Sequence, residues 1–126
     1  MLLSHNVLSD LPPASLASLT SLSSLSLDHN RLTVLPPGLF QGAPMLQDLA
    51  LNNNYLDNIP SDIASLNKLR TLDLGENRIT ELSEIFSGLE NLLLLHISHN
   101  DIFTSLQKLI ALDLSHNSLT FLLLNC

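Results

Sequence analysis

The feature that most constrains the fold is an asparagine that returns along the chain at nearly constant intervals. It occurs at Asn6, Asn30, Asn54, Asn77, Asn100 and Asn117. The intervals are 24, 24, 23, 23 and 17 residues. A period of this length predicts that one small structural unit is repeated and stacked, because a single unit cannot bury its own apolar face.

Leucine or isoleucine flanks each asparagine at fixed distances. An apolar residue lies three positions before it and another lies two positions after it, as Leu27 and Leu32 do around Asn30. Five units also carry the earlier leucines, which gives the pattern L-x-x-L-x-L-x-x-N-x-L. Leucines at intervals of two and three do not keep a helical spacing, so the pattern argues against a helical bundle.

Each unit divides into a strand, a turn and a return segment. The alternating x-L-x-L-x stretch predicts a short strand with its leucines inward, and stacked copies form a parallel sheet. The chain must turn sharply after the strand, where an inward asparagine amide can satisfy buried backbone groups of a neighbouring coil. A second apolar set, such as Leu35, Leu39 and Phe40, predicts a return segment on the opposite face.

This pattern resembles the leucine-rich repeat family over essentially the whole chain. The resemblance implies an α/β right-handed solenoid, a horseshoe arc with a concave parallel β-sheet and irregular or short helical convex segments. We expect one domain over residues 1–126 with about six repeats. The 24-residue units with Leu35-Pro36-x-x-Leu39-Phe40 are similar to the extracellular repeats of Toll-type receptors, those of insects above all.

The last unit and the two ends depart from this pattern. The 17-residue unit lacks about six residues between Ile102 and Leu106, below the roughly 20 to 29 residues of the family, and predicts an irregular coil between 102 and 109. The chain starts inside a repeat and ends without a polar cap. We therefore expect a fragment of a longer parent, with self-association through uncapped ends such as Leu122, Leu123 and Leu124.

Composition narrows the class of partner. The formal net charge of -7 argues against a nucleic-acid partner, since phosphate contacts need clustered Lys and Arg. The single cysteine, Cys126, excludes an internal disulfide, and no stretch approaches the roughly 20 apolar residues that direct membrane insertion requires. No phosphate-cradling or nucleophile motif occurs, so we expect neither an enzyme nor a cofactor.

The third, fifth, seventh and eighth positions of each unit point outward from the predicted strand and its turn. None holds Lys or Arg, whereas several hold Asp or Glu, and this predicts a protein ligand with a basic or neutral face. The predicted partner-binding residues are Asp28, His29, Asp48, Asn52, Asp73, Glu76, His96, His99, Asp113 and His116. The alternative is that these acids only solubilise the surface and binding occurs elsewhere.

Four histidines share the eighth position of their units. Neighbouring strands lie about 4.8 Å apart, which predicts that His5 lies near His29 and His99 near His116. Adjacent imidazoles could bind zinc or respond to acidification. Because no cysteine supplements either pair, the sequence assigns no metal.

These observations predict a protein–protein interaction module. The resemblance implies part of a receptor or adhesion ectodomain of signal transduction and innate immunity, extracellular or at the cell surface. One alternative is a cytoplasmic scaffold or adaptor, favoured by the lack of N-x-S/T sites and disulfides. The other is a truncated remnant without independent function.

Overall fold

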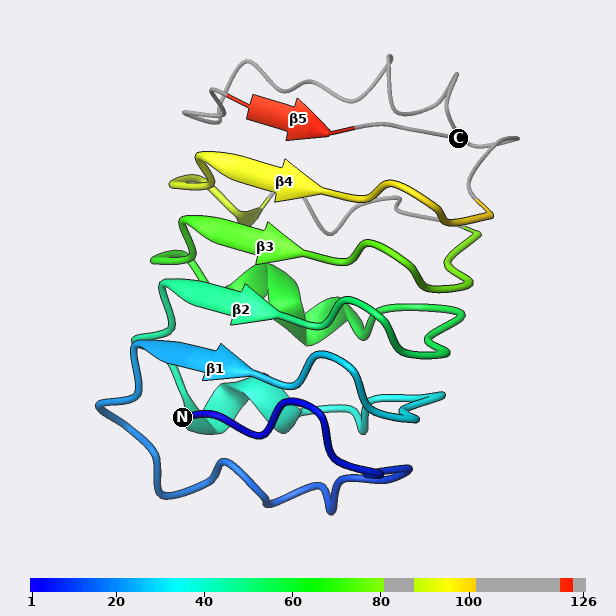
Figure 1. The fold of residues 1–126 in the computed structure, drawn as a ribbon. Coiled ribbons are helices and arrows are strands. Elements are labelled where there is room, and N and C mark those ends of the chain that lie inside the picture. Colours follow the sequence, from blue (N-terminus) through cyan, green and yellow to red (C-terminus); the bar gives the residue numbers. More distant parts are fainter. Residues whose placement is uncertain (81–87, 102–120, 124–126) are drawn as a thin grey trace.

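Five short parallel strands lie side by side in one sheet, each contributed by one coil of a stacked chain (Figure 1). The computed structural model describes residues 1–80, 88–101 and 121–123. The strands are β1 (Ser24–Ser26), β2 (Asp48–Ala50), β3 (Thr71–Asp73), β4 (Leu94–His96) and β5 (Phe121–Leu123). They follow one another in sequence order, which confirms the predicted parallel sheet.

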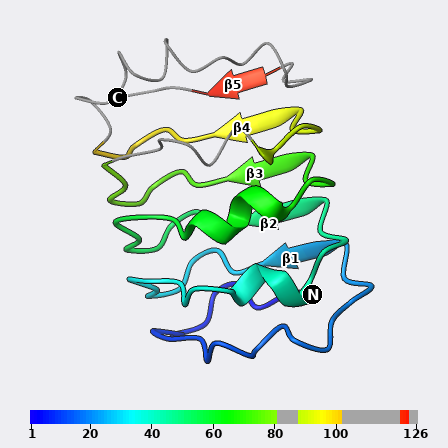
Figure 2. The same cartoon turned by 180° about the vertical axis from the view of Figure 1, so that it is seen from behind.

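Two short 3-10 helices form part of the opposite face. They are η1 (Leu39–Gly42) and η2 (Ser61–Ser65), and they lie beside each other behind the sheet (Figure 2). The return segments of successive coils lie very close together at Gly42. A Cβ atom added there would lie 2.3 Å from the carbonyl oxygen of Leu16 in the preceding coil. Short helical convex segments were predicted, and their presence confirms that part of the fold class.

Strand register places equivalent residues of successive units next to each other. Leu25 pairs with Leu49, Leu49 with Leu72, and Leu72 with Leu95. The first coil joins the sheet through one parallel bridge between Leu2 and Ser26. Residues at one position of the repeat therefore form a column that runs across the sheet.

The inward leucines form one continuous core. The fourth and sixth positions of the units from Leu25 to Ile97 are each at most 2% exposed. The return segments add a second buried layer, in which Phe40 is the largest side chain. The alternation of inward leucine and outward residue is therefore confirmed, and it leaves the outward columns free for contact with a partner.

The recurring asparagines connect each coil to the one before it. Asn54 donates from Nδ2 to the carbonyl of Leu27, 3.1 Å away in the preceding coil, and accepts at Oδ1 from the backbone N–H of Leu32 at 3.1 Å. Asn30, Asn77 and Asn100 repeat this arrangement with their own preceding coils. The predicted role of the asparagine is confirmed.

The strand beside β4 is not the one that the sequence predicted. Counting from the 17-residue unit, residues 111–113 would follow Leu94–His96, yet β4 pairs with Phe121–Leu123. Corresponding residues of β4 and β5 are 27 positions apart, within the family's roughly 20 to 29, whereas the expected spacing was only 17. The predicted irregular coil between 102 and 109 lies outside the described residues.

Candidate functional site

The outward residues of β1 to β4 enclose a shallow hollow of about 270 Å³, and we call this surface the sheet face. The residues that line it come from all four strands and are mostly third- and fifth-position residues. They are Ser24, Leu25, Ser26, Asp48, Leu49, Ala50, Thr71, Leu72, Asp73, Leu94 and His96. Three predicted site residues, Asp48, Asp73 and His96, are thus brought together in one hollow.

Hydrogen bonds hold the two carboxylates of the hollow in place. Thr71 donates from Oγ1 to Asp48 Oδ1 at 2.6 Å. Asp73 Oδ1 accepts from the backbone N–H of Gly75 at 3.0 Å and lies 3.0 Å from His96 Nδ1. No Lys or Arg lines the hollow, so these acids have no cationic partner there other than the His96 imidazole when it is protonated.

In the first coil and after each of the strands β1 to β4, a turn fixes the eighth position of the unit. His5, His29, Asn53, Glu76 and His99 all have a positive φ, between 54° and 56°. The backbone N–H groups of the first four donate to the next coil, as His29 does to the carbonyl of Asn52 at 3.0 Å. The left-handed conformation favours Asn and His among residues other than glycine, which accounts for part of the histidine column. Sequence analysis missed this backbone requirement, although the recurrence of His and Asn was its signal.

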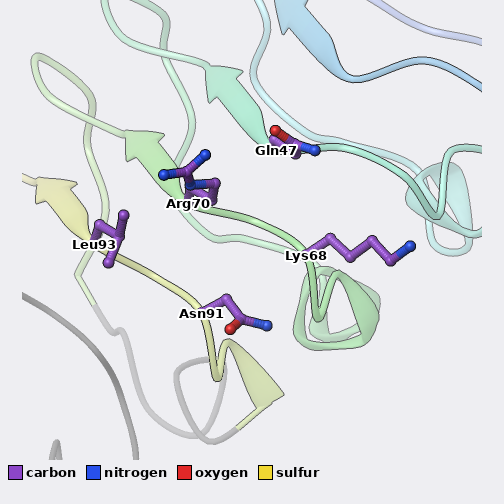
Figure 3. A pocket seen from close by; sticks show the side chains of 5 residues that line it. All are labelled: Gln47, Lys68, Arg70, Asn91 and Leu93. Carbon is purple, nitrogen blue, oxygen red and sulfur yellow. The ribbon is translucent and has the colours of Figure 1, made fainter.

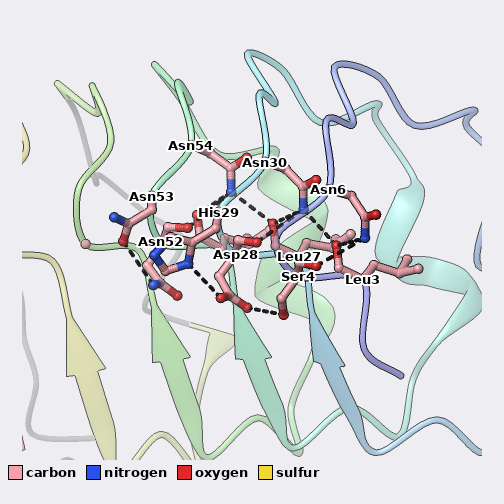
Figure 4. Close-up of polar contacts among 12 residues, drawn as sticks. Leu3, Ser4, Asn6, Leu27, Asp28, His29, Asn30, Asn52, Asn53 and Asn54 are labelled. Atoms are coloured by element: carbon pink, nitrogen blue, oxygen red, sulfur yellow. Dashed lines mark hydrogen bonds and ion pairs between the residues drawn. The ribbon is translucent and has the colours of Figure 1, made fainter.

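At the first two units, the turns form a polar cluster around Asp28 (Figure 4). Ser4 donates from Oγ to Asp28 Oδ1 at 2.7 Å, and His29 Nδ1 lies 2.9 Å from Asp28 Oδ2. Burial on its own raises the pKa of Asp28. Hydrogen bonds from Ser4, from His29 and from the backbone of Asp28 lower this pKa, as does the charge of His29, and the net result is a pKa below its ordinary value. Asp28 is therefore held as a carboxylate at neutral pH.

The imidazoles of His5 and His29 stack on each other beside this cluster. Their ring centroids are 4.2 Å apart and their planes differ by 21°. The proximity of these two histidines was predicted and is confirmed. The sequence analysis predicted Asp28 as a partner-binding residue but not as a neighbour of both histidines. Its carboxylate and the donor atoms of the two histidines lie within 4.8 Å of one another.

The remaining predicted residues divide into two sets. Asn52, Glu76 and His99 lie at the strand-ending turns rather than in the hollow, with His99 Nε2 3.6 Å from Glu76 Oε1. Asp113 and His116 lie outside the described residues, so the proximity of His99 to His116 stays a prediction. The place beside His96 that the sequence assigned to Asp113 is held by Leu123.

The seventh position is not outward in every unit, contrary to the sequence analysis. Gly75 and Ser98 are both buried. The His96 ring lies over Gly75, where an added Cβ would be 2.9 Å from Cε1, and His96 Nε2 makes a short contact with Ser98 Oγ. A long side chain from the fifth position thus covers part of the seventh column.

A second hollow, of about 360 Å³, lies on the side of the solenoid where the chain enters the strands (Figure 3). Gln47, Lys68, Arg70, Asn91 and Leu93 line it, and the sequence analysis did not predict it. Among the described residues, neither Lys68 nor Arg70 forms an ion pair with a carboxylate. Basic charge is therefore present on this side and absent from the sheet face.

The chain belongs to the leucine-rich repeat family. The family model for the leucine rich repeat matches residues 20–79 and 44–102. Among curated protein sequences, none matches the chain significantly. The repeats of this family typically act as protein–protein interaction modules and not as enzymes. Within the described residues, no helix has the length and apolarity needed to cross a bilayer.

Within this family the chain is similar to a segment of a Toll-type receptor. The structure of the Toll–Spatzle complex from Drosophila matches with 33% identity and a TM-score of 0.77, covering 95% of this chain and 17% of that one. The leucine-rich repeat domain of APL1B matches with 33% identity and a TM-score of 0.72, covering 77% and 29%. The functional domain of InlJ from Listeria monocytogenes matches with 27% identity and a TM-score of 0.74, covering 97% and 24%. The chain spans less than a third of the length of each of these proteins.

Proposed function

We propose that the sheet face binds a protein ligand that presents a basic or neutral surface. The observation that carries this proposal is the hollow across β1 to β4, in which Asp48 and Asp73 are fixed by hydrogen bonds and no Lys or Arg is present. Fixed carboxylates attract and orient a complementary cationic group while they repel acidic surfaces. The preorganisation of these side chains adds to affinity, because few of them need to be ordered on binding.

Asp28, His29, Asn52, Glu76 and His99 extend this proposed surface along the strand-ending turns. Except at His99, hydrogen bonds from coil to coil hold their backbone, so a partner would meet a rigid row of polar groups. Rigid polar groups at the edge of an interface favour specificity over raw affinity. The proposed ligand therefore covers both the hollow and the turns that follow it.

The similarity to Toll and APL1B supports a place in an extracellular or cell-surface ectodomain with a role in signalling and innate immunity. Toll was solved in complex with Spatzle, and this precedent supports a protein as the ligand. An epitope tag on the protein, stained in intact cells, tests the location. Staining of intact cells is expected, and staining only after permeabilisation would instead favour the cytoplasmic scaffold.

Binding to the sheet face is tested with a charge-reversed variant, Asp48→Lys/Asp73→Lys. The full chain is immobilised and screened by biolayer interferometry against purified secreted proteins of the same organism. The matched control is Asp57→Lys/Glu90→Lys, which makes the same change in charge at two exposed residues that do not line the hollow. Ligands are expected to bind the parent and the control, and to bind the sheet-face variant at least about tenfold more weakly, since like charges across an interface cost several kcal/mol.

A ligand that binds all three proteins equally would contradict the proposal and direct attention to the hollow lined by Lys68 and Arg70. A non-cooperative thermal melt of the full chain would instead support the remnant without independent function.

Self-association is tested by light scattering over a range of concentrations. We expect association, since Leu2 and Val7 of the first coil are 82% and 71% exposed, and a monomer at every concentration would contradict it.

A further inference from the structure

We propose that His5, Asp28 and His29 bind a zinc ion across the first two coils. The donor atoms of these three side chains lie within 4.8 Å of one another. Neighbouring donors around a tetrahedral zinc are about 3.3 Å apart, given zinc–ligand bonds of roughly 2.0 to 2.2 Å. The side chains therefore need to close by about 1.5 Å at most, which rotation of exposed imidazoles allows. Both histidines are exposed and free to make this adjustment.

The backbone brings the two imidazoles together before any ion binds. His5 and His29 occupy the same position in consecutive units, with φ of 56° and 55°. The N–H of His5 donates to the carbonyl of Asp28 at 3.1 Å, which links the two turns directly. The rings stack with their centroids 4.2 Å apart. The backbone is therefore already arranged before binding, and a prepared site binds its ligand more tightly for that reason.

Asp28 turns a pair of histidines into a set of three ligands. Its side chain is only 16% exposed, and Ser4 holds Oδ1 at 2.7 Å while Oδ2 faces His29 Nδ1 at 2.9 Å. A carboxylate that is already oriented can both coordinate the ion and fix the neighbouring ring. Two imidazoles and one carboxylate suit zinc, whereas calcium and magnesium prefer sites built from oxygen alone.

Other histidines of the described chain lack this arrangement. His99 lies 3.6 Å from Glu76, and His96 lies 3.0 Å from Asp73, so each has one carboxylate and no second imidazole in a group of three. Zinc bound by three protein ligands keeps a fourth position for water or for a side chain of a partner. The ion would also tie the first coil to the second, because its ligands come from both.

The experiment measures zinc binding to the full chain by isothermal titration calorimetry. A Cys126→Ser background removes the only thiol. The test variants are His5→Asn and His29→Asn, since asparagine already occupies the same left-handed position at Asn53. The matched control is His99→Asn, which removes a histidine at the same position of a later coil. Thermal melts without metal establish that every variant is folded.

We expect one zinc per chain in the background protein and in His99→Asn. Each test variant is expected to bind zinc at least about tenfold more weakly, as is Asp28→Asn, because loss of even an outer ligand costs about 10- to 100-fold. Zinc should also raise the melting temperature of the background protein and not that of the test variants. The proposal would be overturned if the background protein, His5→Asn and His29→Asn bound zinc equally well. It would also be overturned if His99→Asn weakened zinc binding as much as they do, or if the background protein bound no zinc at millimolar concentration.

Discussion

Replacement of Asn54 by leucine tests whether the asparagine column or the leucine core holds neighbouring coils together. Asn54 is 4% exposed and bonds to two coils at once. Its Nδ2 donates to the carbonyls of Leu27 and Leu51, and its Oδ1 accepts from the N–H of Leu32. A leucine of similar size adds apolar contact at this place but makes none of these bonds.

The expected loss follows from the partners that remain. The carbonyl of Leu27 keeps a donor in Asn30, and that of Leu51 keeps one in Asn77, so each loses one of two hydrogen bonds, about 0.5 to 1.5 kcal/mol apiece. The buried N–H of Leu32 donates to no other acceptor in the described contacts and is left unsatisfied at about 1 to 3 kcal/mol. The free energy of unfolding should therefore fall by about 2 to 6 kcal/mol.

Urea denaturation followed by circular dichroism and by Tyr55 fluorescence measures this loss, and two probes check that unfolding is cooperative. The matched control is Asn6→Leu at the same position of the first unit, where the side chain is exposed and bonds only within its own turn. It should change stability by no more than about 0.5 kcal/mol. If both variants lose the same free energy, the asparagines do not hold the coils together and the reasoning is refuted.

Three further perturbations test other parts of the structure. Gly42→Ala places a methyl group against a backbone carbonyl of the preceding coil and should cost about 1 to 3 kcal/mol in urea denaturation, whereas Gln41→Ala on the exposed side should be nearly neutral. Phe40→Ala empties the largest buried position and should cost about 3 to 5 kcal/mol, and a smaller loss than Gly42→Ala would contradict the assigned core. The lowered pKa of Asp28 means that its stabilising effect is present above the pKa of the unfolded chain and is lost as the pH falls through the folded pKa. Ser4→Ala should raise that pKa and move the loss to higher pH, which carboxyl ¹³C NMR and melts at several pH values would detect; an unchanged profile would argue against the bond from Ser4.

The sequence predicted the sheet, the core and the asparagine contacts because every unit is surrounded by copies of itself. A leucine at the fourth position meets a leucine at the fourth position of the next coil, as Leu49 meets Leu25 and Leu72. Periodicity along the chain therefore fixes neighbours in space. The same reasoning predicted Asp48 and Asp73 on one face, and both line the hollow across the strands.

Prediction was wrong or silent where the outcome depends on one particular unit. The position of β5 at Phe121–Leu123 departs from the asparagine period, because its residues lie 27 positions after their partners in β4. The burial of Gly75 and Ser98 depends on where the His96 ring lies, and the hollow around Lys68 and Arg70 depends on side chains that stand before the strands. None of these features repeats, so no period in the sequence marks them.

The histidine column shows how a structural demand and a functional one can be separated. A residue with a left-handed backbone conformation follows each of the strands β1 to β4. Histidine tolerates this conformation better than most residues, so a histidine there needs no function to explain it. His99 fits that explanation, with one exposed carboxylate nearby. His5 and His29 differ because their rings stack on each other and share Asp28, whose place beside both rings is not required by the positive φ. It is this carboxylate, and not the histidines themselves, that marks the first two coils as a site for an ion.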